Sequence, residues 1–238
     1  MDLRIGILQC DHVAEELQAQ HGNYPEMFSQ LIHDQDQDIE ICTYDLTANQ
    51  FPVDLSACDG YIITGSQFSA YDELPWIHKT KNLIQQLDQQ QIPTIGICFG
   101  HQLIAEALGG KVAKAQDKGW GVGVHHWQVT EKPEWMDNTD VEQFAMRASH
   151  QDQVINAPPE SVVFASSDFC PVAGFQFNKL LTFQGHPEFS RDYAEALINK
   201  RVARIGESRV TAARNSLKHD VDADLVAQWM ISFIQKHQ

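Results

Sequence analysis

The sequence predicts a three-layer α/β fold, in which a mostly parallel sheet carries helices on both faces and continues into an antiparallel strand extension. Three observations predict it. Residues 3–108 alternate short apolar runs with helical patterns, as parallel strands joined by helices do. Residues 111–184 instead hold short strand-like runs separated by turns. The 238 residues are 43% hydrophobic, which suits one α/β domain over residues 1–238 with a full core. The alternation in its first half predicts a flavodoxin- or Rossmann-like sheet.

In the first half, apolar runs predict strands, and apolar residues three and four positions apart predict helices. Residues 24–32, for example, place Phe28, Leu31 and Ile32 on one side of a helix. The predicted elements are a strand at 3–8, a helix at 24–32, strands at 39–44 and 59–63, a helix at 74–90, a strand at 92–97 and a helix at 103–108.

The second half predicts antiparallel strands that extend or flank the parallel core. The strand-like runs are 111–114, 122–130, 143–148, 161–166, 171–177 and 180–184. Helices resume at 190–204 and at 221–237, where Leu225, Trp229 and Phe233 form an apolar stripe. Residues 206–220 are polar, and we expect them to be a mobile connection.

Charge and cysteine content exclude several classes of function. The formal net charge is −15, from 32 acidic and 17 basic residues, so the chain would repel nucleic-acid phosphates and anionic membranes. Five cysteines without a CxxC pair indicate reduced thiols rather than disulfides or a zinc site. No apolar run has the length of a signal peptide core or a membrane span, so we expect a cytoplasmic protein.

The most informative stretch is Gly96-x-Cys98-x-Gly100, between the strand at 92–97 and the following helix. It has the nucleophile elbow pattern with cysteine in place of serine. A thiol at the head of a helix is favoured as thiolate, and the backbone N–H after it is free to bind an oxyanion. Since a cysteine that ends a buried strand is often only a small apolar residue, the prediction of a nucleophile also needs a base.

A candidate base follows the strand at 180–184, in Gly185-His186-Pro187-Glu188. The end of this strand lies at the same sheet edge as the elbow if the two strands are parallel. His186 would serve as general base and acid, and Glu188 would orient its ring, which gives a Cys-His-Glu triad. His150 is a second candidate base, but His186 is preferred because it has an acidic neighbour.

An oxyanion hole is predicted from two backbone N–H groups, those of Gly65 and Phe99. Gly65 lies in Thr64-Gly65-Ser66, directly after the strand at 59–63. A plain β-turn would have the same sequence signature, so this prediction depends on where the turn lies relative to Cys98.

Taken together, these motifs resemble the class I glutamine amidotransferase family, and the likeness spans most of residues 1–190. Gly96-Ile97-Cys98-Phe99-Gly100-His101-Gln102 is similar to that family's nucleophile motif, and Gly185-His186-Pro187-Glu188 to its His/Glu motif. Ser149-His150-Gln151-Asp152 resembles a Ser-His-Gly-Asp segment of the GMP synthetase glutaminase domain. Tyr71-Asp72 with Pro75-Trp76, and Gly119-Trp120-Gly121, resemble stand-alone members.

The resemblance implies a reaction and a set of roles. Cys98 would attack the γ-carboxamide of glutamine, form a γ-glutamyl thioester and release ammonia, with His186 and Glu188 as the rest of the triad. Gly65 and Phe99 would stabilise the oxyanion, and no metal or organic cofactor would be needed. The residues that would hold the amino-acid end of the substrate are Gln102, Ser149, His150 and Gln151.

The sequence departs from the family pattern in two places. Thr64-Gly65-Ser66-Gln67 stands where members often carry Ser-Gly-Gly-Pro, and Gln151 replaces a glycine. No ATP-pyrophosphatase region or Walker-type loop follows, so we expect this chain alone not to make GMP. A separate synthetase subunit is a possible partner.

Three alternatives stay open from the sequence. The first is a γ-glutamyl peptidase that cleaves glutathione-like compounds with the same thiol. The second is a non-enzymatic regulatory or binding module that keeps the fold; the presence of all three triad residues argues against it. The third is a cysteine hydrolase that shares the elbow but resembles the Gly-His-Pro-Glu motif poorly.

Overall fold

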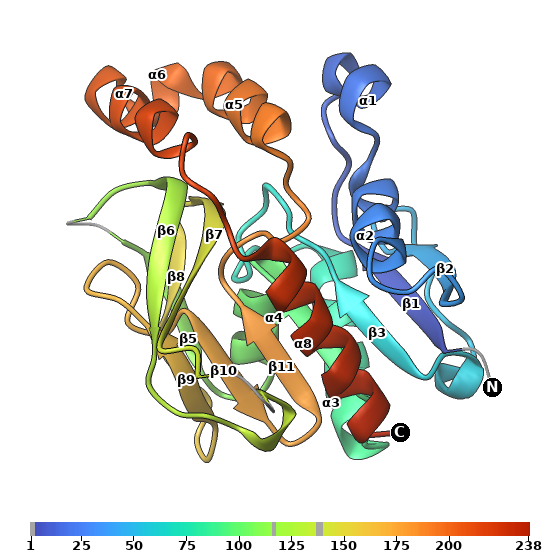
Figure 1. Ribbon diagram of the computed structural model, residues 1–238. Helices are drawn as coiled ribbons and strands as arrows, with labels where there is room; N and C mark the ends of the chain where they lie inside the picture. Colours follow the sequence, from blue (N-terminus) through green and yellow to red (C-terminus); the bar gives the residue numbers. More distant parts are fainter. Residues whose placement is uncertain (1–2, 116–117, 137–139) are drawn as a thin grey trace.

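The computed structural model describes residues 3–115, 118–136 and 140–238 (Figure 1). Its main sheet has nine strands in the order β2-β1-β3-β4-β11-β10-β9-β6-β7. The strands are β1 Arg4–Gln9, β2 Glu40–Asp45, β3 Gly60–Ile63, β4 Thr94–Ile97, β6 Gly121–Val129, β7 Gln143–His150, β9 Val162–Ser166, β10 Gly174–Phe177 and β11 Leu180–Phe183. A second sheet pairs β5 Lys111–Lys114 with β8 Asp152–Asn156.

The main sheet is parallel on one side and antiparallel on the other. Strands β2, β1, β3, β4 and β11 run parallel, whereas every pair from β11 to β7 is antiparallel. In the central pair, Gly96 of β4 lies opposite Thr182 of β11, and Ile97 opposite Phe183. The predicted α/β fold with its antiparallel extension is therefore confirmed, and β4 and β11 end at the same sheet edge.

Helices cover both faces of the parallel part (Figure 1). On one face α2 and α8 pack with Ile5, Ile7 and Ile62, and on the other α3 and α4 pack with Tyr61 and Ile63. Helices α5, α6 and α7 lie beyond the carboxyl edge of the sheet (Figure 1). The helices are α1 Glu15–His21, α2 Tyr24–His33, α3 Pro75–Gln89, α4 Phe99–Ala107, α5 Arg191–Lys200, α6 Val202–Ile205, α7 Glu207–Ser216 and α8 Ala223–Lys236, with 3-10 turns at Leu55–Ala57 and Glu134–Met136.

The expectation of a mobile connection at 206–220 is wrong, because most of it is the helix α7. Val210, Ala213 and Leu217 are buried against Val122 and its neighbours. Their spacing of three and four residues is a helical stripe, but the polar residues around it hide the pattern. The backbone of β6 comes so close to α7 that a Cβ on Gly123 would lie 2.2 Å from Ser216 Oγ.

Smaller differences concern where elements begin. Helix α4 starts at Phe99 rather than at residue 103, because Gly100 packs closely against β3 and allows the helix to begin directly after Cys98. Helix α1 and strand β8 were not predicted. Helix α1 buries no side chain and so has no apolar stripe in the sequence.

Among the described residues, none of the helices combines the length and apolarity that crossing a membrane requires.

Docking of α7 predicts a stability effect. Leu217→Ala should lower the free energy of unfolding by about 2–3 kcal/mol, because it leaves a cavity in a buried contact. Urea denaturation of both proteins measures this difference. The control Thr211→Ala changes an exposed position of the same helix and should cost well under half as much. Equal, negligible effects of the two substitutions would mean that α7 does not contribute to the fold.

Candidate active site

Cys98 occupies the turn between β4 and α4. Its φ is +52° and its ψ is −97°, a conformation that costs a non-glycine residue about 1 kcal/mol. The surrounding structure holds the turn: Cys98 N–H donates to Phe183 O at 2.8 Å, and Cys98 O accepts from Gln102 N–H at 3.0 Å. The thiol therefore projects from the head of α4, at the carboxyl edge of the sheet, as the elbow pattern predicts.

The two glycines of the motif allow close packing rather than an unusual φ. A Cβ on Gly96 would lie 2.8 Å from the backbone of Gly100, and one on Gly100 would lie 2.4 Å from Ile63 O. Larger residues would push α4 away from β3 and β4. The left-handed conformation falls on Cys98 itself.

His186 lies three residues beyond the end of β11 and is almost fully buried. Its Nδ1 is 2.7 Å from Glu188 Oε1, so the carboxylate fixes the ring and its tautomer. The ring also stacks on Phe189, with centroids 3.8 Å apart and planes at 10°. Its backbone N–H donates to Arg147 O on β7 at 2.8 Å. The imidazole is thus held from three directions.

The electrostatics of this site favour a charged imidazole. Burial by itself lowers the pKa of His186, but the charges of Glu188 and Cys98, with hydrogen bonds to both side chains, raise that pKa to about 10. The structure therefore brings Cys98, His186 and Glu188 into one connected group. An imidazolium beside the sulfur favours a thiolate and can later deliver a proton.

Gln184 is a further polar contact of the thiol, and sequence reasoning missed it. Its Nε2 donates to Cys98 Sγ at 3.5 Å, and its Oε1 accepts from Gln102 Nε2 at 3.1 Å. Gln184 is fully buried. Its position next to Gly185-His186 was the available signal, but a side chain that points back from a strand end cannot be told from the sequence.

The turn after β3 lies against both members of the thiol–imidazole pair. A Cβ on Gly65 would be 2.8 Å from His186 Cε1 and 3.8 Å from Cys98 Cβ, so only glycine fits here without moving the ring. The N–H of Phe99 belongs to the first turn of α4 and has no partner within the helix. Gly65 and Phe99 therefore both lie beside Cys98.

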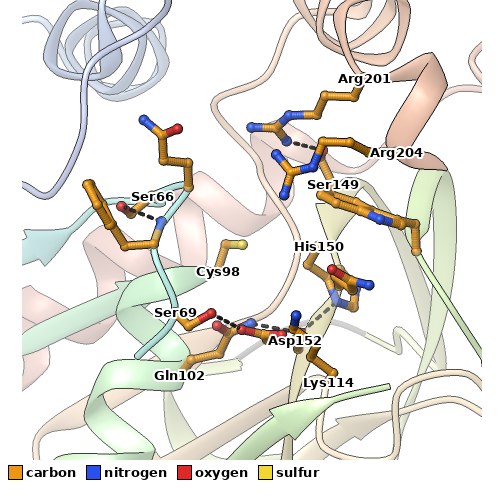
Figure 2. Close-up of a pocket in the computed structure, with 14 residues that line it drawn as sticks. Ser66, Ser69, Cys98, Gln102, Lys114, Ser149, His150, Asp152, Arg201 and Arg204 are labelled. Atoms are coloured by element: carbon orange, nitrogen blue, oxygen red, sulfur yellow. Dashed lines mark hydrogen bonds between the residues drawn. The ribbon is translucent and has the colours of Figure 1, made fainter. Parts of the chain in front are cut away.

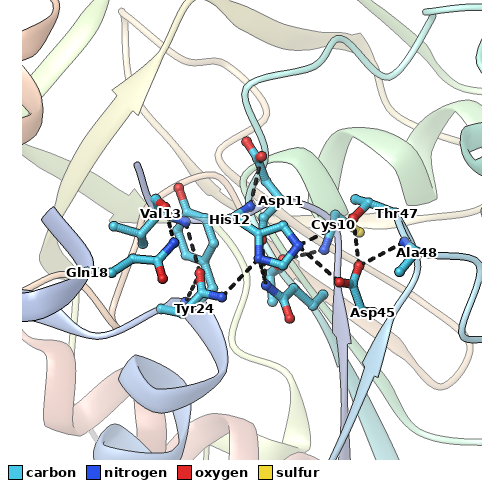
Figure 3. A network of polar contacts seen from close by, with 12 residues as sticks. Cys10, Asp11, His12, Val13, Gln18, Tyr24, Asp45, Thr47 and Ala48 are labelled. Atoms are coloured by element: carbon cyan, nitrogen blue, oxygen red, sulfur yellow. Dashed lines mark hydrogen bonds and ion pairs between the residues drawn. The ribbon is translucent and has the colours of Figure 1, made fainter. Parts of the chain in front are cut away.

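The loop after β1, drawn in Figure 3, contacts the Gly65 turn and holds it in place. Asp11 Oδ2 accepts from the N–H of Gln67 at 2.8 Å, and the N–H of Cys10 donates to Thr64 Oγ1 at 2.9 Å. His12 ties the same loop to β2, with its Nε2 3.0 Å from Asp45 Oδ2. These contacts hold the Gly65 turn against Cys98 and His186 from behind.

A solvent-open hollow of about 110 Å³ lies over Cys98 (Figure 2). The structure brings all four residues predicted to hold a substrate to its wall: Gln102, Ser149, His150 and Gln151. Gln102 is fixed by its Nε2, which donates to Asp152 O at 2.8 Å, and Ser149 Oγ accepts from Arg201 Nη1 at 2.9 Å. Sequence reasoning missed Asp152 and Arg201 as wall residues, although Asp152 stands in a motif it had singled out.

His150 is unsuited to be the base. It is buried, and its Nδ1 lies 3.0 Å from Asp152 O. Burial, with a smaller contribution from His125, lowers its pKa to about 3, so the ring stays neutral. Within the part of the chain that the structure describes, His150 has no carboxylate contact like that of His186, which agrees with the preference for His186.

Comparisons with known proteins show what the chain as a whole is similar to. A model of the family described as glutamine amidotransferase class-I matches residues 22–204. The chain is 29% identical over 224 residues to gamma-glutamyl peptidase 2 of Arabidopsis thaliana, covering 90% of this chain and 88% of that protein. It is 32% identical over 136 residues to a subunit of the glutamine-hydrolyzing GMP synthase of Methanothermobacter thermautotrophicus, covering 50% and 69%. The crystal structure of a glutamine amidotransferase from Thermotoga maritima matches the fold with a TM-score of 0.76 at 16% identity, covering 99% and 97%.

The site predicts selective alkylation of Cys98. At pH 6, iodoacetamide should modify Cys98 first, because Cys98 lines the open hollow beside the His186 imidazolium, which stabilises negative charge on an attacking sulfur. Burial raises the pKa of Cys170 to about 12 and that of Cys58 to about 11, so these thiols stay protonated. Peptide mass mapping after a time course identifies the labelled residue. In His186→Ala the rate of alkylation at pH 6 should fall at least tenfold. An unchanged rate would mean that the imidazole does not control the reactivity of the thiol.

Proposed function

The chain belongs to the class I glutamine amidotransferase family, and on that premise we propose that it is a cysteine hydrolase that releases ammonia from the γ-carboxamide of glutamine through a γ-glutamyl thioester. The observation that carries the proposal is the connected group of Cys98, His186 and Glu188 beneath an open hollow. A thiol, a buried imidazole and a carboxylate in this order are the parts that acyl transfer by a cysteine needs.

In the proposed reaction, the Cys98 thiolate attacks the amide carbon and the C=O electrons move to oxygen. The N–H groups of Gly65 and Phe99 stabilise that oxyanion. His186, as imidazolium, gives its proton to the leaving nitrogen, the C–N bond breaks, and ammonia leaves a thioester on Cys98. The neutral ring then takes a proton from water, which attacks the thioester and releases glutamate and the thiolate. His186 returns to imidazolium, and Glu188 stabilises each charged stage.

The wall of the hollow supports the rest of the assignment. We propose that Gln102, Ser149, His150 and Gln151 hold the amino-acid end of the substrate, either with side-chain groups or with their backbone. Gln102 is already oriented by Asp152 O and Gln184 Oε1, so its carbonyl oxygen is presented in a fixed direction. A preset wall of this kind lowers the entropy cost of binding.

Hydrolysis of a γ-glutamyl peptide is the second candidate. The same thioester forms, and only the leaving amine differs. It is favoured by the similarity to gamma-glutamyl peptidase 2, since the match covers 88% of that protein's length. The open hollow over Cys98 also favours it. The likeness to a protein named as one subunit of GMP synthase supports the other candidate, in which released ammonia passes to a separate synthetase subunit.

Substrate turnover tests the proposal. Purified protein offered glutamine or γ-glutamylglycine should release glutamate, and Cys98→Ala should lower the rate at least a thousandfold while thermal unfolding stays unchanged. Cys170→Ala, another buried thiol, is the matched control and should retain most activity. Glutamine turnover at least tenfold above that of the peptide supports the amidotransferase-type reaction, and the reverse supports the peptidase. No turnover of either, with no covalent label on Cys98, would favour a binding module.

The raised pKa of His186 predicts the alkaline limb of activity. Because the imidazolium donates the proton to the leaving group, kcat/KM should hold up to about pH 9 and fall near pH 10. In Glu188→Gln the charge that raises this pKa is lost while burial still lowers it, so the limb should move to lower pH by at least one unit. The rate should also fall, though less than in His186→Ala. Asp192→Asn, which changes an exposed acid on α5, should leave the pH profile unmoved. If Glu188→Gln had the same pH profile as the wild-type protein, the role assigned to Glu188 would be contradicted.

A further inference from the structure

Positive side chains gather at the hollow although the chain as a whole is strongly acidic. The sequence has 32 acidic and 17 basic residues, yet Lys114, Arg201 and Arg204 all line the space over Cys98. The acid among the lining residues is Asp152, whose Oδ2 already accepts a hydrogen bond from Ser69 Oγ at 2.6 Å. The local charge is therefore opposite in sign to that of the molecule.

Trp120 gathers the two arginines at one side of the hollow. The guanidinium carbons of Arg201 and Arg204 lie 5.7 Å and 5.2 Å from the centroid of the same indole ring. Arg201 is further oriented by Ser149 Oγ, to which its Nη1 donates at 2.9 Å. Figure 2 shows both side chains reaching from the helical segment toward the hollow, next to Ser149. Stacking on an aromatic face orients a guanidinium without using its N–H donors.

Among the described residues, neither arginine forms an ion pair with a carboxylate, and the side chain of Arg201 makes its hydrogen bond to Ser149 Oγ. Two like charges held on one ring repel each other, and this cost is relieved when an anion binds between them. Arginine forks match the geometry of a carboxylate with two parallel hydrogen bonds.

We propose that Arg201 and Arg204, held by Trp120, form a carboxylate subsite at the rim of the hollow and set its preference for acidic γ-glutamyl substrates. This inference rests on the proposed function and adds the residues that select the substrate. The carboxylate has two possible sources with the same chemistry, the α-carboxylate of the glutamyl half and a carboxylate on the leaving half. Because the molecule as a whole repels anions, such substrates need local cations of this kind.

The test compares three substrates in the whole protein: glutamine, γ-glutamylglycine and γ-glutamylglycinamide. Arg201→Gln should raise the KM of carboxylate-bearing substrates about tenfold, and Arg204→Gln, which is more exposed, about threefold. A loss confined to γ-glutamylglycine assigns the leaving half, and an equal loss for all three assigns the α-carboxylate. Arg214→Gln, which removes an arginine bonded to Asn199 outside the hollow, is the matched control and should change no KM.

A binding arm separates failure of this inference from failure of the proposed function. Calorimetric titration of γ-glutamylglycine into Cys98→Ala protein measures affinity without turnover, and the affinity should fall in Arg201→Gln and with rising salt. Unchanged KM and affinity in both arginine variants would overturn the subsite. If wild-type protein turns over none of the three substrates, the proposed reaction fails, and the titration alone then decides the subsite: lost affinity in Arg201→Gln supports it, and unchanged or absent binding overturns it.

Discussion

The register between β4 and β11 is the constraint on which the site depends. Ile97 lies opposite Phe183, so Cys98 follows one strand and His186 follows its parallel neighbour at the same edge of the sheet. The N–H of Cys98 donates to Phe183 O, so the pairing continues one residue into the strained turn. A shift of one residue would turn alternate side chains to the other face and separate sulfur from imidazole. The strained φ of Cys98 persists because this pairing and the start of α4 hold it from both sides.

Burial makes this arrangement both costly and effective. His186 and Glu188 lie away from water, where an ion pair is stabilising only if its geometry is good and its partners stay in place. Glu188 Oε1 contacts the ring, whereas its Oε2 is buried without a hydrogen-bond partner among the described residues. Because Oε2 makes no hydrogen bond there, the buried carboxylate relies on the contact between Oε1 and His186 for its stabilisation. Phe189 stacks on the ring and keeps solvent from its face.

The sequence predicted the parts of the site whose chemistry is local, and missed those set by packing. Gly96, Cys98 and Gly100 indicate their own turn, and His186 and Glu188 lie two residues apart, so short motifs located them. Gln184 and Arg201 reach the site from the end of a strand and from the junction of two helices, and neither carries a pattern that gives the direction of its side chain. Helix α7 was missed because only Val210 and Ala213 of its ten residues are buried, and their burial depends on β6, which lies far away in sequence.

The bridge between Arg147 and His186 has a further consequence. The backbone of His186 is anchored by β7, and Arg147 Nη1 also donates to Phe189 O at 2.8 Å. Two residues along the same strand stands Ser149, which lines the hollow. One strand therefore carries both a wall residue of the hollow and the support of the imidazole. In the proposed reaction, a molecule that fits badly against Ser149 would also displace His186, so discrimination between ligands and the rate of proton transfer would share a single mechanical origin.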